Sequence, residues 1–291
     1  MLRWRLLVSA VLIPCVIGLF VWDARLGPAA PVLFVICLLA GLRCVWELLL
    51  LLRRDTPQAR CGPVAACVVL LLMSAWGPHW QSALGGPSIR IPTLDQVFAG
   101  CVLLLLVLEV FRFREPGGHV RTLGAELLAV TYAGLLLSVT AQLRWIGPNG
   151  NGYLALGSLI AAAKMGDVGA YTLGKLFGRR KMAPYLSPGK TWMGAFGAVL
   201  GAVVGTLLWL RPAVPLFGLT WNSQWWAWAC AYGAVMGVAG LLGDLCESLI
   251  KRDVGVKDSA VLLPGFGGLL DLLDSILFAG PVAVVLWRLF Y

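Results

Sequence analysis

The chain is a succession of long apolar stretches, separated by short loops rich in Arg, Pro and Gly. Each stretch has roughly the 20 residues that a helix needs to cross a bilayer. The stretches are continuously apolar and do not alternate at every second residue, so they predict helices and not the strands of a membrane barrel. The expected spans are 6–22, 29–52, 62–77, 94–111, 123–143, 153–174, 192–210, 225–245 and 269–290. We therefore expect an all-α fold, a polytopic integral membrane helical bundle of about nine transmembrane helices.

Composition and charge support this assignment. With 59% hydrophobic and 13% charged residues, the chain is too apolar for a soluble domain of 291 residues. Most of the 23 Lys and Arg residues fall in loops that are cytoplasmic if the N-terminus is cytoplasmic, as the positive-inside rule requires. This placement explains the net charge of +9 without a nucleic-acid partner. We expect an inner (cytoplasmic) membrane protein with a cytoplasmic N-terminus.

Two features of the sequence invite other interpretations. Arg3 and Arg5 precede an apolar core, as in a signal peptide, but the absence of a clear cleavage site favours a retained anchor. The eight cysteines form no CxxC pair, and most lie inside expected spans. They are interpreted as buried apolar residues, neither disulfides nor zinc ligands.

The chain divides into an N-terminal transmembrane scaffold, 1–150, and a C-terminal transmembrane catalytic region, 151–291. The scaffold carries few charges in its spans. Arg43 and Glu47, spaced i, i+4, are interpreted as an ion pair at the membrane interface, with a direct role in a site as the alternative. Four other polar residues are assigned no chemical role. Glu109 and Glu126 have the same interfacial interpretation, and His79 and His119 are expected in loops without partners.

Polar residues accumulate from residue 160 onward. On the expected span 153–174, Asp167, Tyr171 and Gly174 lie at i, i+4 and i+7, on one helix face. A carboxylate inside a membrane is costly unless it is paired or hydrated, so Asp167 is a functional candidate. The alternative is an ion pair between Lys164 and Asp167 that only locks two helices.

The basic stretch 175–191 that follows contains Pro184, Pro188 and Gly189, which predict a shaped loop at the cytoplasmic rim. Its end offers hydroxyls, an ammonium and helix amides to an anion such as phosphate, from Ser187, Lys190 and Thr191. It is not a P-loop, because the required upstream glycines are missing and no strand is expected before it. A lipid-facing positive-inside loop is the alternative.

The segment 243–274 is the richest in charge. Asp244, Glu247, Ser248 and Lys251 lie at i, i+3, i+4 and i+7, Arg252 and Lys257 follow, and Asp271 and Asp274 open the last apolar helix at i, i+3. The last two acids could instead cap that helix. Carboxylates beside Lys and Arg suit Mg²⁺ shared with substrate phosphates. The pattern indicates a Mg²⁺-dependent phosphoryl- or nucleotidyl-transfer site that opens to the cytosol.

Residues 244–274 resemble the motif of phosphatidate cytidylyltransferases, also called CDP-diacylglycerol synthases. The match keeps a set of charged, small and proline residues at the family's spacing: Ser248, Lys251, Arg252, Lys257, Asp258, Pro264, Gly265, Gly267, Gly268, Asp271 and Asp274. The upstream stretch 167–192 is similar to a second block of the family. Three positions depart from the family pattern: Phe266 replaces a histidine, Leu272 an arginine and Met193 an acid.

The resemblance implies transfer of CMP from CTP to phosphatidic acid, with release of pyrophosphate. It implies that metal ions, Mg²⁺ with a second cation such as K⁺, are held by Asp244, Asp271 and Asp274. Substrate phosphates would be bound by Lys190, Lys251, Arg252 and Lys257, with further substrate contacts from Ser187, Thr191, Ser248, Asp167 and Tyr171. The catalytic set is Asp244, Asp271, Asp274 and Lys251. CTP, membrane phosphatidic acid and a second copy in a homodimer are the expected partners.

Other functions stay open from the residues alone. One is the same chemistry on another lipid acceptor, such as a polyprenol. Another is a catalytically inactive relative, which the three departures favour weakly. A third is a transporter in which Asp167 and Lys164 serve ion movement, although a transporter needs no cluster of lysines for CTP.

Overall fold

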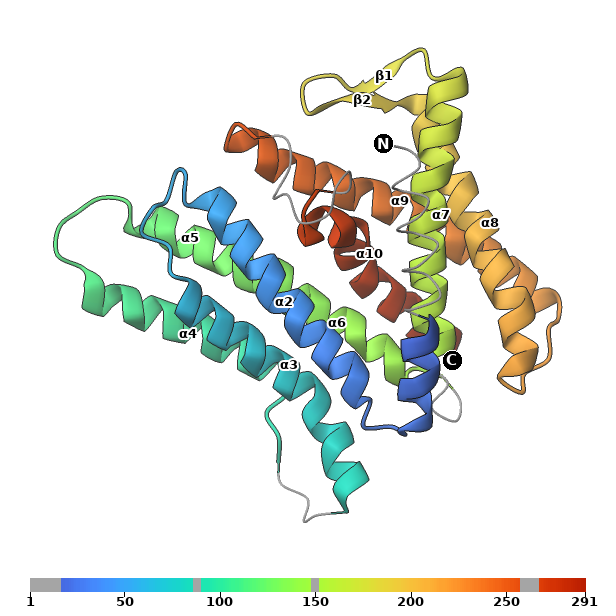
Figure 1. Cartoon of the computed structure of the whole chain (residues 1–291), viewed down its shortest axis with the longest axis horizontal. Helices are drawn as coiled ribbons and strands as arrows, with labels where there is room; N and C mark the ends of the chain where they lie inside the picture. Colours follow the sequence, from blue (N-terminus) through green and yellow to red (C-terminus); the bar gives the residue numbers. More distant parts are fainter. Residues whose placement is uncertain (1–16, 86–89, 148–151, 257–266) are drawn as a thin grey trace. The chain divides into compact units, whose positions relative to one another are not determined.

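The computed structural model describes residues 17–85, 90–147, 152–256 and 267–291 (Figure 1). Within these ranges the chain is almost entirely helical and divides into two compact units. The first unit comprises Met1–Ser138 and Asp258–Leu272, and the second comprises Val139–Lys257 and Leu273–Tyr291. The last helix therefore begins in the first unit and continues in the second. Each unit is described by itself.

Among the described residues, seven helices are long and apolar enough to cross a membrane: Pro31–Leu52, Cys61–Ala83, Leu94–Arg112, His119–Trp145, Trp192–Leu216, Ser223–Asp253 and Leu269–Phe290. They confirm the predicted polytopic helical membrane fold. The expected span 6–22 begins outside the described residues. The expected span 153–174 is helical, as α7 (Tyr153–Phe177), but it is not among the seven. The count of about nine spans is thus approximate.

Four long helical segments form the first unit (Figure 1): α2 (Pro31–Leu52), α3 (Cys61–Leu84), α4 (Leu94–Arg112) and α5 (His119–Ala129), which continues into a π-helical turn, η1 (Val130–Leu135). Apolar side chains with no exposed surface form the core between them, among them Leu48, Leu49, Val68, Leu71 and Trp76. The Trp76 indole donates to the carbonyl of Ala30 at 3.1 Å. Burial of these side chains holds α2 and α3 together.

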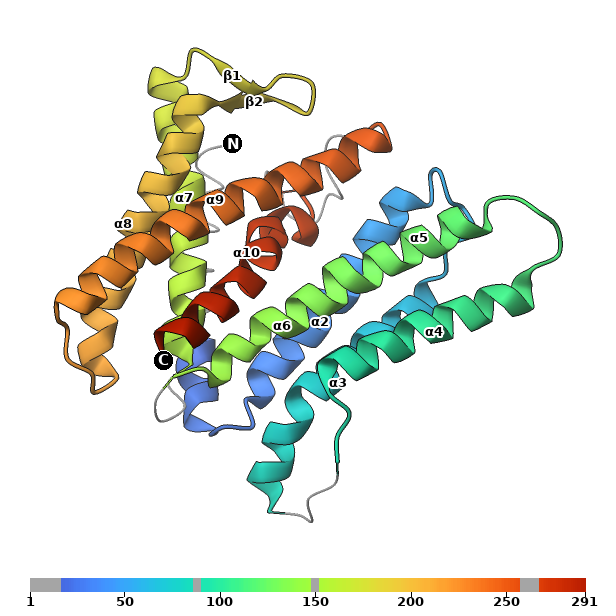
Figure 2. The ribbon, with the colours of Figure 1, turned by 180° about the vertical axis from the view of Figure 1, so that it is seen from behind.

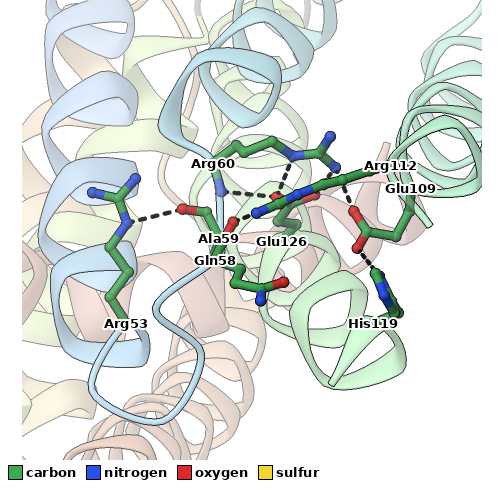
Figure 3. Close-up of polar contacts among 8 residues, drawn as sticks. All are labelled: Arg53, Gln58, Ala59, Arg60, Glu109, Arg112, His119 and Glu126. Atoms are coloured by element: carbon green, nitrogen blue, oxygen red, sulfur yellow. Dashed lines mark hydrogen bonds and ion pairs between the residues drawn. The ribbon is translucent and has the colours of Figure 1, made fainter. Parts of the chain in front are cut away.

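A buried charge network joins α3, α4 and α5 (Figure 3). Arg60, the residue before α3, donates through its guanidinium to Glu126 at 2.9 and 3.0 Å and to Glu109 at 3.0 Å. Its backbone amide also donates to Glu126, at 2.8 Å. Nδ1 of His119 lies 2.7 Å from Glu109. We call these four residues the Arg60 network. Hydrogen bonding to Glu126 raises the pKa of Arg60, so its guanidinium is charged.

The Arg60 network corrects three expectations. Glu109 and Glu126 do not extend toward solvent, because their side chains are only 8% and 0% exposed. His119 is the first residue of α5 and has Glu109 as a partner. His79, also expected in a loop, lies inside α3. Glu109, Glu126 and His119 have partners on neighbouring elements, which spacing along one helix does not reveal.

The second unit contains α7 and a hairpin of β1 (Lys181–Ala183) and β2 (Ser187–Thr191). These are followed by α8 (Trp192–Leu216), α9 (Ser223–Asp253) and the part of α10 (Leu269–Phe290) that starts at Leu273. The two strands pair antiparallel, with Lys181 opposite Thr191 and Ala183 opposite Ser187. The prediction of a loop over 175–191 is therefore partly wrong, and a strand, β1, does precede Gly189. Pro188 is tolerated because each strand of a two-stranded ribbon has one unpaired edge.

Small residues let α7 and α8 pack with their backbones close together, and Figure 2 shows the two helices side by side. A Cβ atom on Gly169 would lie 2.1 Å from the carbonyl oxygen of Gly197, and one on Gly201 would lie 2.3 Å from that of Met165. Small residues at this spacing are typical of helix pairs in membranes. The close contact extends along the part of α7 that carries Lys164 and Asp167.

Aromatic side chains join α9 and α10 within the second unit. Trp228 stacks on Tyr232, and its ring centroid lies 4.4 Å from that of Trp287. The fully buried Trp287 donates to the hydroxyl of Ser158 on α7, at 3.1 Å. This packing fixes α7, α9 and α10 relative to one another within the unit.

Candidate active site

Acidic and basic side chains from four elements of the second unit gather in one place. We call this group the acid–lysine cluster; it consists of Lys164 and Asp167 on α7, Lys190 on β2, Asp244 on α9 and Asp274 on α10. All five were singled out from the sequence, Lys164 as an ion-pair partner and the others as site residues. The structure brings them together from positions more than a hundred residues apart.

Two ion pairs define the geometry of the cluster. Nζ of Lys190 lies 2.8 Å from Oδ2 of Asp244, and Nζ of Lys164 lies 3.2 Å from Oδ2 of Asp167. The charges of Asp244 and Lys190 also act on Asp167. The charges of Asp244, Lys164 and Asp167 act on Asp274. The expected ion pair between Lys164 and Asp167 therefore exists, but it belongs to a larger group of charges.

A close crossing of α9 and α10 places Asp244 beside Asp274. A Cβ atom on Gly243 would lie 2.9 Å from the carbonyl oxygen of Asp274 and 2.7 Å from Cβ of Phe278, so only glycine fits there. The acid that follows Gly243 is thus carried against the turn of α10 that contains Asp274. Asp274 is buried, whereas the Asp244 side chain is 41% exposed.

The cluster differs from a fully buried ion pair because the side chains of Asp167 and Asp244 are partly exposed. The Asp167 side chain is 50% exposed and Lys164 is 38% exposed. Lys190 is largely covered, at 15%, and Asp244 accepts a second, long hydrogen bond from Ser248 at 3.5 Å. The cluster therefore combines fixed cations with carboxylate oxygens that a ligand can reach.

The hairpin residues have different roles in the structure. The hydroxyl oxygen of Thr191 accepts from the amide of Gly194 at 3.0 Å, so this buried side chain caps α8. Lys190, its neighbour, faces Asp244. Ser187 begins β2 and is partly exposed. The structure thus joins Lys190 to the cluster and gives Thr191 a capping contact that the sequence did not indicate.

The end of α9 holds other predicted residues. Lys251 pairs with Glu247 at 2.9 Å, and Glu247 is almost fully buried. The Arg252 guanidinium donates to the carbonyls of Leu186 at 3.3 Å and Val256 at 2.9 Å, which ties the hairpin to α9. The i, i+4 spacing of Glu247 and Lys251 places them on one face of α9, where the structure shows that they pair.

Remaining predicted positions lie elsewhere. Tyr171 is exposed on α7, and its hydroxyl accepts from Lys175 at 3.4 Å. Asp271 belongs to the first unit, where its Oδ2 accepts from the amide of Gly268 at 2.7 Å. This is the helix-capping contact expected as an alternative for that acid. Lys257 and Phe266 lie outside the described residues, whereas Met193 is the second residue of α8 and Leu272 lies in α10.

The sequence interpretation also missed the role of Glu47. Its ion pair with Arg43 is confirmed, at 2.8 Å, but the Glu47 side chain is fully buried and does not extend toward solvent. Its two carboxylate oxygens accept from the amides of Leu269 and Leu270, at 3.1 and 2.9 Å. No sequence signal connects residues 222 positions apart.

The donor set suits a metal that shares its ligands with a substrate. In the part of the chain that the structure describes, no group of three or more His, Cys, Asp or Glu side chains could hold a metal ion. Mg²⁺ rarely has such a cage, since it usually keeps several waters and binds one or two carboxylates together with substrate phosphates. The carboxylates of Asp244 and Asp274 fit that pattern.

The structure is that of a polytopic helical membrane protein with a group of acids and lysines in its second unit. The chain belongs to the cytidylyltransferase family, whose model matches residues 3–290.

Individual relatives agree with this assignment. An uncharacterized protein of Escherichia coli, YnbB, is 38% identical over 171 residues, which cover 58% of this chain and 54% of that protein. A phosphatidate cytidylyltransferase of Mycobacterium bovis is 37% identical over 177 residues, covering 60% and 52%. The match thus spans about half the length of these two relatives. A phosphatidate cytidylyltransferase of Pseudomonas aeruginosa is 34% identical over 289 residues, covering 99% and 97%.

Proposed function

We propose that the chain is a CTP:phosphatidate cytidylyltransferase, which transfers CMP from CTP to phosphatidic acid to give CDP-diacylglycerol and pyrophosphate. The observation that carries the proposal is the acid–lysine cluster: fixed lysines beside accessible carboxylates, inside a helical membrane protein. The names of the relatives from M. bovis and P. aeruginosa support the choice of acceptor.

The reaction balances without a strong base. A phosphate oxygen of phosphatidic acid attacks the α-phosphorus of CTP, a new P–O bond forms, and the bond between the α-phosphorus and the bridging oxygen breaks. Pyrophosphate carries away that electron pair. The second pKa of a phosphate monoester is about 6, so the attacking oxygen is already largely anionic near neutral pH. The replacement of the family histidine by Phe266 is therefore compatible with activity.

The residues of the chain would bind and orient the two substrates. Asp244, Asp271 and Asp274 would hold Mg²⁺, with a second cation such as K⁺ nearby. A bound Mg²⁺ supplies positive charge against the polyphosphate oxygens. Lys190, Lys251, Arg252 and Lys257 would neutralise the remaining phosphate charge, with Ser187, Thr191, Ser248, Asp167 and Tyr171 completing the substrate contacts. Lys190 would exchange its contact with Asp244 for a phosphate oxygen.

The site is proposed to open to the cytosol, from which CTP arrives, while phosphatidic acid enters from the bilayer. The protein would reside in the inner membrane as a homodimer with a cytoplasmic N-terminus. The distribution of Lys and Arg along the sequence supports this orientation.

The proposal is tested with purified protein in liposomes that contain phosphatidic acid and Mg²⁺. CTP is labelled at either the α- or the γ-phosphate. The α label is expected in the lipid fraction and the γ label in pyrophosphate, and Asp271→Asn is expected to abolish lipid labelling.

Other outcomes would overturn the proposal. Transfer of the γ label to a lipid would indicate a kinase. Transfer of the α label only to a polyprenyl phosphate or another added lipid would indicate a different acceptor. No labelled lipid with any acceptor would indicate an inactive relative or a transporter.

A further inference from the structure

Helix α10 is capped by a residue from a distant part of the chain. The first amides of a helix have no partner within the helix, and a side chain just before the helix usually accepts from them. Gly268, which precedes Leu269, has no side chain. Instead, Glu47 of α2 accepts from the amides of Leu269 and Leu270, at 3.1 and 2.9 Å. These contacts lie within the first unit.

The capping carboxylate is itself held in place. The Glu47 side chain has no exposed surface, and Nε of Arg43 pairs with it at 2.8 Å. The Arg43 guanidinium also lies over the Trp46 ring, 4.3 Å from its centroid. Burying a carboxylate is costly unless charge and hydrogen bonds compensate, and here a guanidinium and two helix amides do so. Loss of the Glu47 charge would therefore release the start of α10.

The capped turn contains one of the proposed metal ligands. Asp271 follows Leu270 directly, and its Oδ2 accepts from the amide of Gly268 at 2.7 Å. Asp271 is the third residue of α10, so it keeps its direction only while the first turn of the helix is formed. An ordered first turn of α10 thus holds the Asp271 carboxylate in place, and fraying of that turn would release it.

We infer that Glu47 is a positioning residue for cytidylyl transfer: it fixes the first turn of α10 and thereby the carboxylate of Asp271. This inference rests on the proposed function. Glu47 does not touch the reacting atoms and acts only through α10. Its substitution should therefore lower the rate of the reaction more than the binding of CTP.

The test compares Glu47→Gln with Glu126→Gln. Both remove a carboxylate with 0% exposure from the first unit, but Glu126 contacts Arg60 and not α10. Glutamine keeps the length of Glu47 but provides only one carbonyl acceptor for the two amides. The measurements are kcat and KM for CTP, together with amide hydrogen exchange over 267–272.

In Glu47→Gln, kcat should fall about 10-fold while KM for CTP changes less than about 2-fold, as expected for a residue that orients a metal ligand without binding the metal. Exchange over 267–272 should become faster. Glu126→Gln should leave both properties of the folded protein unchanged. If Glu47→Gln does not fold, Arg43→Gln, which leaves the capping carboxylate without its cation, should give a smaller change in the same direction.

Two results would overturn the inference: faster exchange with unchanged kcat, which would make the contact merely structural, or unchanged exchange over 267–272. Hydrogen exchange needs no turnover. A wild-type protein that labels no lipid would therefore defeat the proposed function and the positioning role with it, while exchange would still decide whether Glu47 caps α10.

Discussion

The Arg60 network of the first unit and the acid–lysine cluster of the second unit are both groups of charges in an apolar protein, but they are built in opposite ways. In the network, Glu126 is 0% exposed and accepts three hydrogen bonds from Arg60 alone. In the cluster, Asp167 is 50% exposed and Asp244 is 41% exposed, and each faces one lysine at ion-pair distance.

The exposure of the two groups indicates which charges stabilise the fold and which are available to a ligand. A buried carboxylate with all its oxygens occupied cannot bind anything without losing those contacts, so the Arg60 network joins helices. In the cluster, Asp167 and Asp244 are partly exposed, so a ligand can reach their carboxylate oxygens beside the paired lysines. Exposure of the carboxylates, and not charge alone, distinguishes the cluster from the network.

The largest effect on stability is expected from breaking the Arg60 network. Glu126→Gln should lower the free energy of unfolding by about 3 kcal/mol, because the substitution leaves Arg60 without its main buried partner. Activity per folded molecule should not change. Thermal unfolding in detergent, followed alongside turnover, measures both quantities.

A Glu126→Gln protein as stable as the wild type would contradict this prediction, since the network would then contribute nothing to stability. Arg114→Gln is the matched control. It removes a charge from the exposed loop between α4 and α5 and should leave stability unchanged.

A smaller effect is expected from the hairpin. Lys190→Met should raise KM for CTP about 10-fold, because one phosphate contact worth roughly 1.4 kcal/mol is lost. Lys181→Met removes the same charge from the exposed strand β1 and should leave KM within about 2-fold. Equal increases in the two variants would mean that the hairpin attracts CTP only through its overall charge. Steady-state kinetics with varied CTP distinguish these outcomes.

Much of the fold and of the cluster could be predicted from the sequence because the signals are local. Long apolar stretches predicted the helices, and the i, i+3, i+4 spacing of Asp244, Glu247 and Ser248 predicted one polar face of α9. The hairpin was missed because its pairing depends on register between Lys181 and Thr191, not on the preferences of a proline-containing stretch.

Contacts between distant segments could not be predicted. His119 has its partner Glu109 on another helix, and Glu47 caps a helix that begins 222 residues later. Both carboxylates looked like ordinary interfacial charges in the sequence, since spacing along one helix reveals only partners on that helix. The structure supplied the burial that separates them from surface ion pairs.

The most direct test of the account is the turnover and thermal stability of Asp244→Asn, measured with α-labelled CTP and phosphatidic acid. Because the Asp244 side chain is 41% exposed and asparagine keeps one oxygen beside Lys190, the substitution should cost less stability than Glu126→Gln. Because it is a proposed metal ligand, lipid labelling should fall at least about 100-fold. Asp253→Asn, at the exposed end of the same helix, should behave as wild type. An Asp244→Asn protein that labels lipid at the wild-type rate, or that loses activity only because it unfolds, would contradict the proposed role of Asp244 as a metal ligand.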